Sequence, residues 1–483
     1  MPKNTSDTSS NAPALVWFRR DLRLADNPAL VAACESERPL ILLYIDETDL
    51  DRPLGAAKKV WLHYSLNALS ESIARKGAKL LLREGPAEII LDEIIDQSGA
   101  KAVYWNRRYE ADGIERDSNI KASLKDAGLS VETFNGSLLT EPWDVETQAG
   151  GYYKVFTPYW RAASQIIGPR IAANPPLNAP EKLTGYTGHL ESDALDLLPE
   201  KLDWDDAVMA DWTPGEAGAM ARLKTFLDGP VKDYVDARNI PSNTEGTSRL
   251  SPHLSAGEIS PRQIWQAARD GKHNADKFLS EIGWREFSYV LLYHNPELAE
   301  KNYKPDFDNF AWRTDKASLK AWTKGQTGYP FVDAGMRELW QTGWMHNRVR
   351  MVVASFLIKH LLIDWRDGED WFWDTLLEAD PAANSASWQW VAGSGADAGP
   401  YFRIFNPFGQ GEKFDKTGEY VRRFVPELKD LPDKYIQTPW TAPKEVLAKA
   451  NVKLGDTYPK PLVEHKMARE RALSRYKESK GED

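Results

Sequence analysis

The apolar positions between residues 14 and 136 fall into five short runs, separated by stretches with helical periodicity. Each run has the length of a buried strand, and glycines follow three of the helical stretches as stop signals. The predicted strands are 14–18, 40–45, 78–82, 102–105 and 130–134, and the predicted helices are 28–34, 57–76, 87–97 and 113–127. Regular alternation of this kind predicts an α/β domain with a parallel, Rossmann-like sheet over residues 12–138.

This domain lacks the common phosphate-binding motifs. No G-x-G-x-x-G follows the first predicted strand, and no G-x-x-x-x-G-K-[ST] occurs anywhere in the chain. We therefore do not expect an ordinary dinucleotide or nucleoside triphosphate site here.

The pattern changes twice further along the chain. Residues 139–212 are rich in Gly, Pro and Asp and predict a long connector. Residues 213–465 have helical periodicity and predict an all-α domain, with helix starts at the Ser-Pro pairs 251–252 and 260–261 and at the Asp-Pro pair 380–381. Residues 1–11 are expected to form a disordered tail, and residues 466–483 a charged helix or tail exposed to solvent.

The composition narrows the class of protein. The 483 residues are 42% hydrophobic and 27% charged, as in soluble globular proteins, and no stretch approaches the ~20 apolar residues of a membrane span. The single cysteine, Cys34, excludes an internal disulfide and a multi-cysteine metal site, and it fits a reducing cytoplasm. The net charge of −10 argues against polyanion binding over the whole surface, but not against one basic groove.

Tryptophan is unusually frequent, with 19 residues of which only five precede residue 200. These rings either fill a large helical core or take part in chemistry.

Residues 246–254 (GTSRLSPHL) place three hydroxyls and Arg249 close to a predicted helix start. Free N–H groups and hydroxyls at such a place attract phosphate. A hydroxyl-rich cap without a ligand would have the same sequence, so this segment alone does not decide.

Residues 344–351 (WMHNRVRM) open a mostly apolar helix that is predicted to run to about Leu362. Asn347, Arg350 and Met351 share one face of it, at i, i+3 and i+4. Burying such groups unpaired would cost a few kcal/mol. They therefore face a ligand, or Arg350 forms a buried ion pair with Glu378 or Asp380.

Residues 378–390 (EADPAANSASWQW) place Asn384 and Trp388 on one helix face, behind the predicted cap Asp380. A buried asparagine amide can both donate and accept a hydrogen bond. Such a group suits a heteroaromatic ligand whose protonation changes with its redox state.

Residues 278–287 (FLSEIGWREF) bring Glu281, Trp284 and Arg285 together at i, i+3 and i+4. An acid beside an indole can hydrogen-bond the edge of a nucleobase while the ring stacks on it. A plain salt bridge between Glu281 and Arg285 is the alternative interpretation.

These four segments, together with residues 17–24 (WFRRDLRL), 326–330 (QTGYP) and 401–407 (YFRIFNP), resemble the photolyase/cryptochrome family. The resemblance extends from about residue 14 to residue 430. It implies an α/β antenna domain joined to an all-α domain that binds FAD.

The resemblance also implies roles for individual residues. Asn384 would face flavin N5, Asp380 would contact the isoalloxazine, and Arg350 would pair with Glu378, where much of the family has aspartate. The residues expected to contact FAD are Tyr234, Thr247, Ser248, Arg249, Leu250, Ser251, Phe278, Asn347, Arg350, Glu378, Asp380 and Asn384.

Trp388, Trp365 and Trp312 stand at the family's spacing for a relay that reduces the flavin from outside. Electron tunnelling falls steeply with distance, so easily oxidised rings placed in steps outpace one long transfer.

Three positions separate the branches of the family. Enzymes that repair (6-4) photoproducts have histidines where Asn347 and Met351 stand, and plant cryptochromes have aspartate where Asn384 stands. Cryptochromes of the DASH kind tend to lose one ring of the pair Trp388 and Trp390. The sequence most resembles the bacterial class III cyclobutane pyrimidine dimer photolyases; a cryptochrome-type blue-light receptor is the alternative.

Such an enzyme repairs pyrimidine dimers in DNA by light-driven electron transfer from excited reduced FAD. The dimer would be flipped out of the duplex, Glu281 and Asn347 would hydrogen-bond it, and Asn384 would complete the catalytic set. No metal is expected. The predicted contacts with damaged DNA are Arg238, Glu281, Trp284, Arg285, Arg348, Met351, Trp390, Arg403, Gln410 and Lys413.

The antenna pigment is expected to be 5,10-methenyltetrahydrofolate, with a deazaflavin as the alternative. Family members that bind folate often show Asn-Glu a few residues after a Tyr-Glu pair; here Tyr109 and Glu110 are followed by Asp112 and Gly113. We expect a cytoplasmic monomer.

Overall fold

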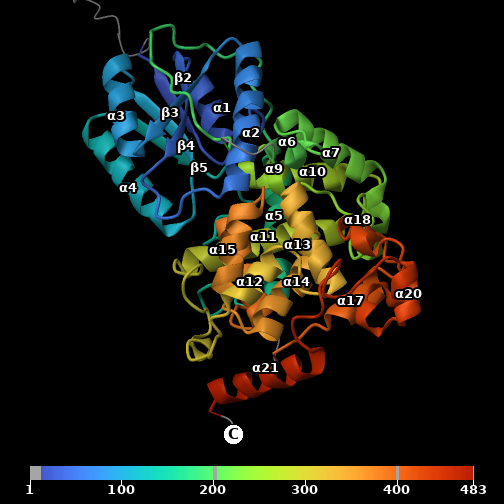
Figure 1. Cartoon of the computed structure of the whole chain (residues 1–483). Coiled ribbons are helices and arrows are strands. Elements are labelled where there is room, and N and C mark those ends of the chain that lie inside the picture. The colour runs from blue at the N-terminus through green and yellow to red at the C-terminus, as the bar shows by residue number, and fades with distance from the viewer. Residues whose placement is uncertain (1–11, 200–203, 399–401, 482–483) are drawn as a thin grey trace, which may run out of the picture.

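In the computed structural model of the protein, the five apolar runs near the N-terminus pair into one parallel sheet (Figure 1). Its strands are β1 (Ala14–Phe18), β2 (Leu40–Glu47), β3 (Leu80–Gly85), β4 (Ala102–Asn106) and β5 (Ser130–Phe134), in the order β3-β2-β1-β4-β5. The structure describes residues 12–199, 204–398 and 402–481, so the tail predicted for residues 1–11 lies outside it.

Helices cover both faces of the sheet. Val16 and Phe18 of β1 pack with α1 (Pro28–Glu35) and α2 (Ala56–Arg75). Leu15 and Trp17 pack on the other face with α3 (Ala87–Ser98) and α4 (Ala111–Asp126). Because both faces are buried, the three central strands β1, β2 and β4 are apolar over most of their length. The edge strands β3 and β5 also carry polar residues. The predicted fold class of this domain is confirmed.

The order of the strands reverses between β1 and β4, which are neighbours in the sheet. In open parallel sheets, ligands commonly bind beyond the carboxyl ends of the strands at such a point. The residues that follow β1 and β4 line a polar crevice at this edge of the sheet.

The segment predicted as a connector contains a long helix, α5 (Phe156–Ala173), which packs against α11 (Asp276–His294). Further along, the connector runs beside β2, where the backbone N–H of Leu40 donates to Thr184 (2.7 Å) and that of Tyr186 donates to Leu40 (2.9 Å). The connector thus contacts both the sheet and the helices, and its boundaries at 139 and 212 stay a prediction.

The rest of the chain is helical (Figure 1). Its longer α-helices are α6 (Trp204–Met209), α7 (Glu216–Asp228), α9 (Ser251–Ala256), α10 (Pro261–Asp270), α11, α12 (Lys316–Thr323), α13 (Pro330–Thr342), α14 (Asn347–Ser355), α15 (Trp365–Thr375), α16 (Pro381–Ala392), α17 (Pro407–Phe414), α18 (Glu419–Phe424), α20 (Lys444–Lys449) and α21 (His465–Ser479). Short helical turns are η2 (Pro230–Asp233), α8 (Tyr234–Ala237), η3 (Pro305–Phe307), η4 (Phe356–Leu361), η5 (Pro426–Leu428), α19 (Asp433–Ile436) and η6 (Pro439–Thr441). The predicted all-α domain is confirmed.

Two of the three predicted helix caps are present. Asp380 accepts hydrogen bonds from the first turn of α16, and Ser260 forms a capping box with Gln263 at the start of α10. Ser251 does not cap, because α9 already begins at that residue and Leu250 precedes it. The helix expected to reach Leu362 is α14 followed by the π-helical turn η4, and it ends where Leu362 takes φ +56°.

The sheet domain rests on the helical domain through α2, which contacts α6, α9 and α15. Gly55, just before α2, lies so close to α15 that a Cβ there would be 2.1 Å from the Trp373 carbonyl oxygen. Within the described residues, no helix is long and apolar enough to cross a membrane.

Candidate functional site in the helical domain

The predicted ion pair between Arg350 and Glu378 is present. The Arg350 Nη2 donates to Glu378 Oε1, while its Nε donates to the Met345 carbonyl at 2.7 Å. The Glu378 side chain is only 7% exposed, and its second oxygen, Oε2, is buried without a hydrogen-bond partner in the described chain. A buried carboxylate oxygen without a partner is costly, so this atom is a candidate ligand contact.

Asp380, the other partner considered for Arg350, is used differently. Its Oδ1 accepts from the backbone N–H groups of Ala382 (3.0 Å) and Ala383 (2.8 Å), which explains why α16 begins there. Its Oδ2 accepts from the Tyr289 hydroxyl at 2.7 Å. Burial, and then the charge of Asp380, raise the pKa of Tyr289, so this hydroxyl stays a proton donor. The carboxylate of Asp380 is thereby held in one orientation.

Asn384, one turn further along α16, is fixed by Glu369 of α15. The Asn384 Nδ2 donates to Glu369 Oε1 (2.8 Å) and to the Glu369 carbonyl (3.1 Å). Both of these atoms can only accept, so the amide nitrogen must face α15 and the Asn384 oxygen must point away from it. No described residue donates to that oxygen. It is available to a ligand.

Among the other residues expected to contact FAD, Tyr234 and Phe278 pack edge to face, with ring centroids 5.8 Å apart. Thr247 and Ser248 are half-buried in the loop before α9, and Leu250 is buried. Ser251 accepts a hydrogen bond from the Trp344 indole at 3.3 Å.

Arg249 does not extend from this loop as a free cation. Its guanidinium lies between two indoles, 4.3 Å from the Trp212 ring and 5.1 Å from the Trp344 ring, where cation–π attraction holds it. Burial lowers its pKa. The residue takes φ +51°, a left-handed conformation that is uncommon outside glycine. Strain of this kind, in a tightly packed loop, is frequent near functional sites.

Four of the residues predicted to meet damaged DNA, namely Arg238, Glu281, Arg348 and Met351, form a connected group. Arg238, after α8, pairs with Glu281 of α11, which also pairs with Lys277 at 2.7 Å. Arg348 of α14 donates to the side chain of Asn239 at 2.6 Å, and its other terminal nitrogen lies 3.9 Å from the Met351 sulfur. The structure therefore places Glu281 and Met351 in one cluster with two arginines.

His346, which was not predicted, lies beneath this cluster. Burial and three nearby arginines, Arg350, Arg348 and Arg238, lower its pKa to about 3. Its Nδ1 accepts from the backbone N–H of Arg348 at 3.1 Å, and its Nε2 is buried without a partner. The ring is therefore neutral at physiological pH.

Three more predicted DNA contacts lie on or beside α17. The Arg348 guanidinium stacks over Phe414 at 4.6 Å, and Gln410, one turn earlier on α17, has a buried amide oxygen without a partner. Arg403 and Lys413 are exposed. Asn347, the first residue of α14, is also exposed and can reach a bound molecule.

The two rings predicted to stack on the lesion lie in separate clusters. Trp284 is half-buried and stacks on Phe156, with centroids 3.8 Å apart and an interplanar angle of 11°. Trp390 is half-buried and donates from its indole to the Asp397 carbonyl at 3.1 Å.

Arg285 is not brought together with Glu281. Its Nη1 donates to the Ser137 carbonyl (2.8 Å) in the sheet domain, and its guanidinium lies 4.9 Å from the Tyr289 ring. The i, i+4 spacing allowed a pair with Glu281, but Arg238 and Lys277 occupy that carboxylate instead. Arg285 thus contributes to the contact between the domains, and its predicted contact with DNA stays a prediction.

The three tryptophans predicted as a relay belong to one hydrophobic core. Trp388 and Trp365 are buried in it, and Trp312 packs at its edge against Phe310, with centroids 4.3 Å apart. A Cβ at Gly368 would lie 2.2 Å from the Trp388 ring, so α15 approaches this indole one turn after Trp365. The Trp365 indole donates to Asn302 at 3.0 Å. Trp388 lies in α16, which carries Asn384, and Trp365 lies in α15, which packs against α16.

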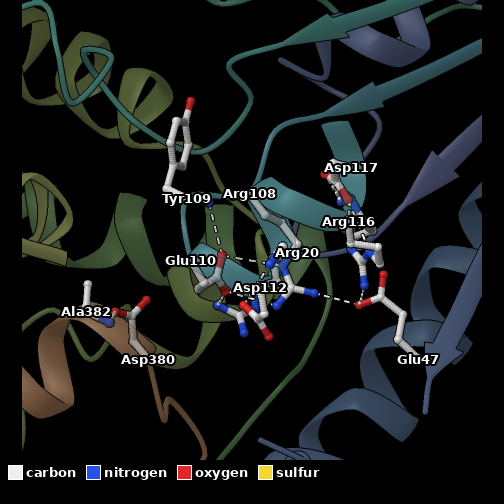
Figure 2. Close-up of polar contacts among 12 residues, drawn as sticks. Arg20, Glu47, Arg108, Tyr109, Glu110, Asp112, Arg116, Asp117, Asp380 and Ala382 are labelled. Atoms are coloured by element: carbon white, nitrogen blue, oxygen red, sulfur yellow. Dashed lines mark hydrogen bonds and ion pairs between the residues drawn. The ribbon is translucent and has the colours of Figure 1, made fainter. Parts of the chain in front are cut away.

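The crevice at the carboxyl ends of β1 and β4 is lined by arginines, but these are paired. Glu110 accepts from Arg20 (2.5 Å) and Arg108 (3.0 Å), while Arg108 also pairs with Glu47 at 2.6 Å (Figure 2). Nearby, Arg116 and Arg19 pair with Asp117. Burial would raise the pKa of Glu110, yet Arg108 and Arg20 lower it far below its usual value.

The remaining cavity in this crevice has a volume of about 20 Å³. Sites for cofactor-sized ligands measure ~300–1,000 Å³. The crevice therefore does not fit a pterin or a deazaflavin, although it occupies the usual ligand position of such sheets.

Sequence reasoning missed Arg52, Tyr289, His346 and Glu369. Glu369 and Tyr289 orient residues that were predicted, and they do so from other helices. Only the proximity of α15 and α11 to α16 reveals them, and helix packing cannot be inferred from motif spacing.

Comparison with known proteins agrees with the motifs. Residues 14–181 match the family model for DNA photolyase, and residues 278–478 match the FAD binding domain of DNA photolyase. The deoxyribodipyrimidine photo-lyase of Agrobacterium fabrum is 54% identical over 478 residues, covering 96% of this chain and 98% of that protein. The chain belongs to the photolyase/cryptochrome family.

Two solved structures of the family are close to this fold. A bacterial class III photolyase from Agrobacterium tumefaciens superimposes with a TM-score of 0.94 at 53% identity, covering 99% of this chain and 100% of that one. A cryptochrome from Synechocystis superimposes with a TM-score of 0.88 at 31% identity, over 96% of this chain and 99% of that one. The family membership gives the helical domain its cofactor, FAD.

Proposed function

We propose that this protein is a class III photolyase that repairs cyclobutane pyrimidine dimers in DNA with blue light. The observation that carries the proposal is the site in the helical domain, in a chain 54% identical to a deoxyribodipyrimidine photo-lyase. There Glu378 and Asn384 each keep one oxygen without a partner in the described chain, beside a cluster of arginines around Glu281.

The residues present fit FAD. Asn384 turns its amide oxygen away from α15, so that it accepts from the N–H of a reduced flavin ring. Arg350, held by Glu378 and Met345, supplies a fixed positive charge for the same ring. Tyr234, Phe278 and residues 247–251 surround the remainder of the cofactor. FAD, once bound and reduced, supplies an electron on excitation by light.

The cluster around Glu281 binds the substrate. A dimer is weakly stacked and paired, so it is flipped out of the duplex at less cost than an intact base. Glu281 and Asn347 hydrogen-bond its carbonyl and imide groups, and Met351 contacts it. Trp284 and Trp390 stack against it, each contributing ~1–3 kcal/mol.

The surrounding basic residues hold the DNA backbone. Arg238 and Arg348 flank the cluster, and Arg403, Gln410 and Lys413 extend it across α17 and the segment before it. The four cations in this set would give a chain of net charge −10 a local site for phosphates. Contacts of this kind fix the position of the duplex without reading its sequence.

The relay Trp388, Trp365 and Trp312 reduces the flavin from the surface. Trp388 lies in α16, one turn after Asn384, and Trp312 is partly exposed at the edge of the core. Trp365 would pass electrons to Trp388, and Trp312, which is partly exposed, would receive them from reductants in solvent.

The antenna pigment in this proposal is 5,10-methenyltetrahydrofolate, and a deazaflavin is the alternative. The crevice beyond β1 and β4 fits neither, so the pigment binds elsewhere on the chain. We place the enzyme in the cytoplasm as a monomer.

Repair of a defined substrate tests the proposal. The protein, with FAD bound and chemically reduced, is mixed with an oligonucleotide that carries one thymine dimer, in blue light and in darkness. We expect restored thymines only in light. A protein that holds reduced FAD, restores nothing and instead forms a long-lived light-induced state would contradict the proposal and favour a cryptochrome-type receptor.

A further inference from the structure

The loop before α2 grips the C-terminal half of α15 across the domain boundary. The Trp373 indole donates to the Pro53 carbonyl at 2.9 Å, and Asp374 accepts from the backbone N–H of Ala56 at 2.9 Å. Gly55 packs directly on the α15 backbone, where any Cβ would overlap it. This contact, which we call the α2–α15 clasp, is made of residues 52–56 and residues 369–374.

Within the clasp, Arg52 is linked to Asn384 through Glu369. It binds Glu369 through two parallel hydrogen bonds, Nη1 to Oε1 (3.0 Å) and Nη2 to Oε2 (2.6 Å). Its guanidinium also lies 4.2 Å from the Trp373 ring, which limits its freedom. The fork of an arginine on a carboxylate fixes the plane of that carboxylate as well as its position.

Glu369 is in turn buried, with a side chain only 2% exposed. Its Oε1 accepts from Asn384 Nδ2 (2.8 Å) and from Ser385 Oγ (3.0 Å) as well as from Arg52. The charge of this carboxylate is therefore compensated by one cation only, Arg52, among the described residues. Without that cation, the acceptor that orients Asn384 would be an unpaired buried charge, which is unfavourable.

We propose that Arg52, in the sheet domain, is a positioning residue that fixes the amide of Asn384 through Glu369 and thereby raises the reduction potential of the bound flavin. This inference rests on the proposed function, because it requires FAD beside Asn384. The α2–α15 clasp then links the contact between the two domains to the reduction potential of the flavin in the helical domain.

The direction of the effect follows from two physical terms. A fixed Asn384 oxygen accepts the N–H of the reduced ring, which stabilises the reduced form. A positive charge behind Glu369 prevents that carboxylate from placing a net negative charge near the ring. Both terms favour the reduced flavin, so losing Arg52 lowers the potential.

The test compares Arg52→Met with two other variants of the holoenzyme. Arg52→Met keeps most of the length of the side chain but loses the guanidinium fork. We expect the one-electron reduction equilibrium of the flavin to shift about tenfold towards the oxidised form, which lowers the potential by ~59 mV. Arg52→Lys retains the charge without the fork and should recover part of that shift. Asp370→Asn is the matched control. Asp370 is the other partner of Arg52, but it is exposed and does not contact Asn384.

A second route avoids dependence on one variant. It combines Arg52→Met with Glu369→Gln, which removes the uncompensated carboxylate but keeps an oxygen that can accept from Asn384. The potential of the double variant should therefore return most of the way towards that of the wild type. A double variant with the same lowered potential as Arg52→Met, or an Arg52→Met potential equal to that of the wild type, would overturn the inference. If Arg52→Met fails to fold, Arg52→Lys decides, and its potential should lie below that of the wild type.

The readout separates this inference from the proposed function. If the wild type binds FAD and repairs dimers while Arg52→Met leaves the potential unchanged, only the role of Arg52 is wrong. If the wild type binds no FAD, the proposed function itself fails.

Discussion

Two polar regions lie on either side of the domain boundary, and they differ in how their charges are partnered. In the crevice beyond β1 and β4, Arg20 and Arg108 share Glu110, and almost no space remains. In the helical domain, one oxygen of Glu378 is bound by Arg350 and the amide nitrogen of Asn384 is bound by Glu369. The other oxygen of Glu378 and the amide oxygen of Asn384 have no partner among the described residues. Tyr289 joins the two regions, since its ring lines the crevice and its hydroxyl holds Asp380.

The difference shows that an abundance of charge does not by itself mark a ligand site. The crevice has the expected position and many cations, yet its carboxylates neutralise them and fill the space. The helical site has fewer charges, but its side chains are oriented by neighbours so that one atom of each stays available. We infer that the first region stabilises the domain contact and that the second binds the cofactor.

The largest effect is expected on FAD binding, for a variant in the helical domain. Arg350→Met leaves Glu378 as a buried, uncompensated carboxylate, at a cost of about 3–5 kcal/mol. If that cost falls on the cofactor site, FAD binding weakens by about a hundredfold or more. Titration of apo-protein with FAD measures it, with Arg475→Met, at an exposed pair on α21, as the control. Unchanged FAD binding would break the distinction between the two regions.

A smaller effect is expected for a change in the crevice beyond β1 and β4. Glu110→Gln removes the charge between Arg20 and Arg108 but keeps part of the hydrogen bonding, so stability should fall by about 1–3 kcal/mol at neutral pH. FAD binding should not change. Thermal unfolding measures the difference, and Glu115→Gln on the same helix is the exposed control.

The pKa of Glu110 also determines how the stability difference between wild type and Glu110→Gln depends on pH. The folded pKa of Glu110 is depressed, so its stabilisation is present above the unfolded value of about 4.3 and is lost as the pH falls below it. The gap between wild type and Glu110→Gln should therefore close on acidification. A gap that widens at low pH would mean that Glu110 does not act through its charge.

The smallest effect on repair is expected for Trp388→Phe. This ring is buried beside Gly368, and in the proposed relay it would serve reduction of the flavin rather than binding of the substrate. Photoreduction of oxidised protein, followed by absorbance, should slow strongly, whereas repair by chemically reduced protein should stay at the wild-type level. A parallel loss of both would indicate that the ring supports the fold of the site instead.

The sequence was sufficient for the sheet, because its three central strands are nearly continuous apolar runs and glycines end three of the helices between the strands. The exception is β3, predicted at 78–82 and observed at Leu80–Gly85, because its second half carries Arg83 and Glu84 near the sheet edge. The helix α5 was missed since Gly168 and Pro169 interrupt its pattern. Packing of Tyr159 and Ile167 into the helical core stabilises it nevertheless.

The site was predictable where a motif spans it and not where two domains meet. Arg350 and Glu378 are 28 residues apart within family motifs, and their pair was expected. Arg52 and Glu369 are 317 residues apart, and Arg52 belongs to no motif. Arg285 had the right spacing for Glu281. Arg238 binds that carboxylate instead, and Arg285 turns towards Ser137.

The most direct test of the account is the repair yield of Glu281→Ala with FAD bound and reduced. This variant removes the carboxylate that Arg238 and Lys277 hold in the substrate cluster, and leaves Arg350, Glu378 and Asn384 in place. We predict an unchanged flavin spectrum and a repair yield about tenfold or more below that of the wild type, as expected for the loss of a charged hydrogen bond worth ~1.5–3 kcal/mol. A yield equal to that of the wild type would contradict the assignment of this cluster as the dimer-binding site.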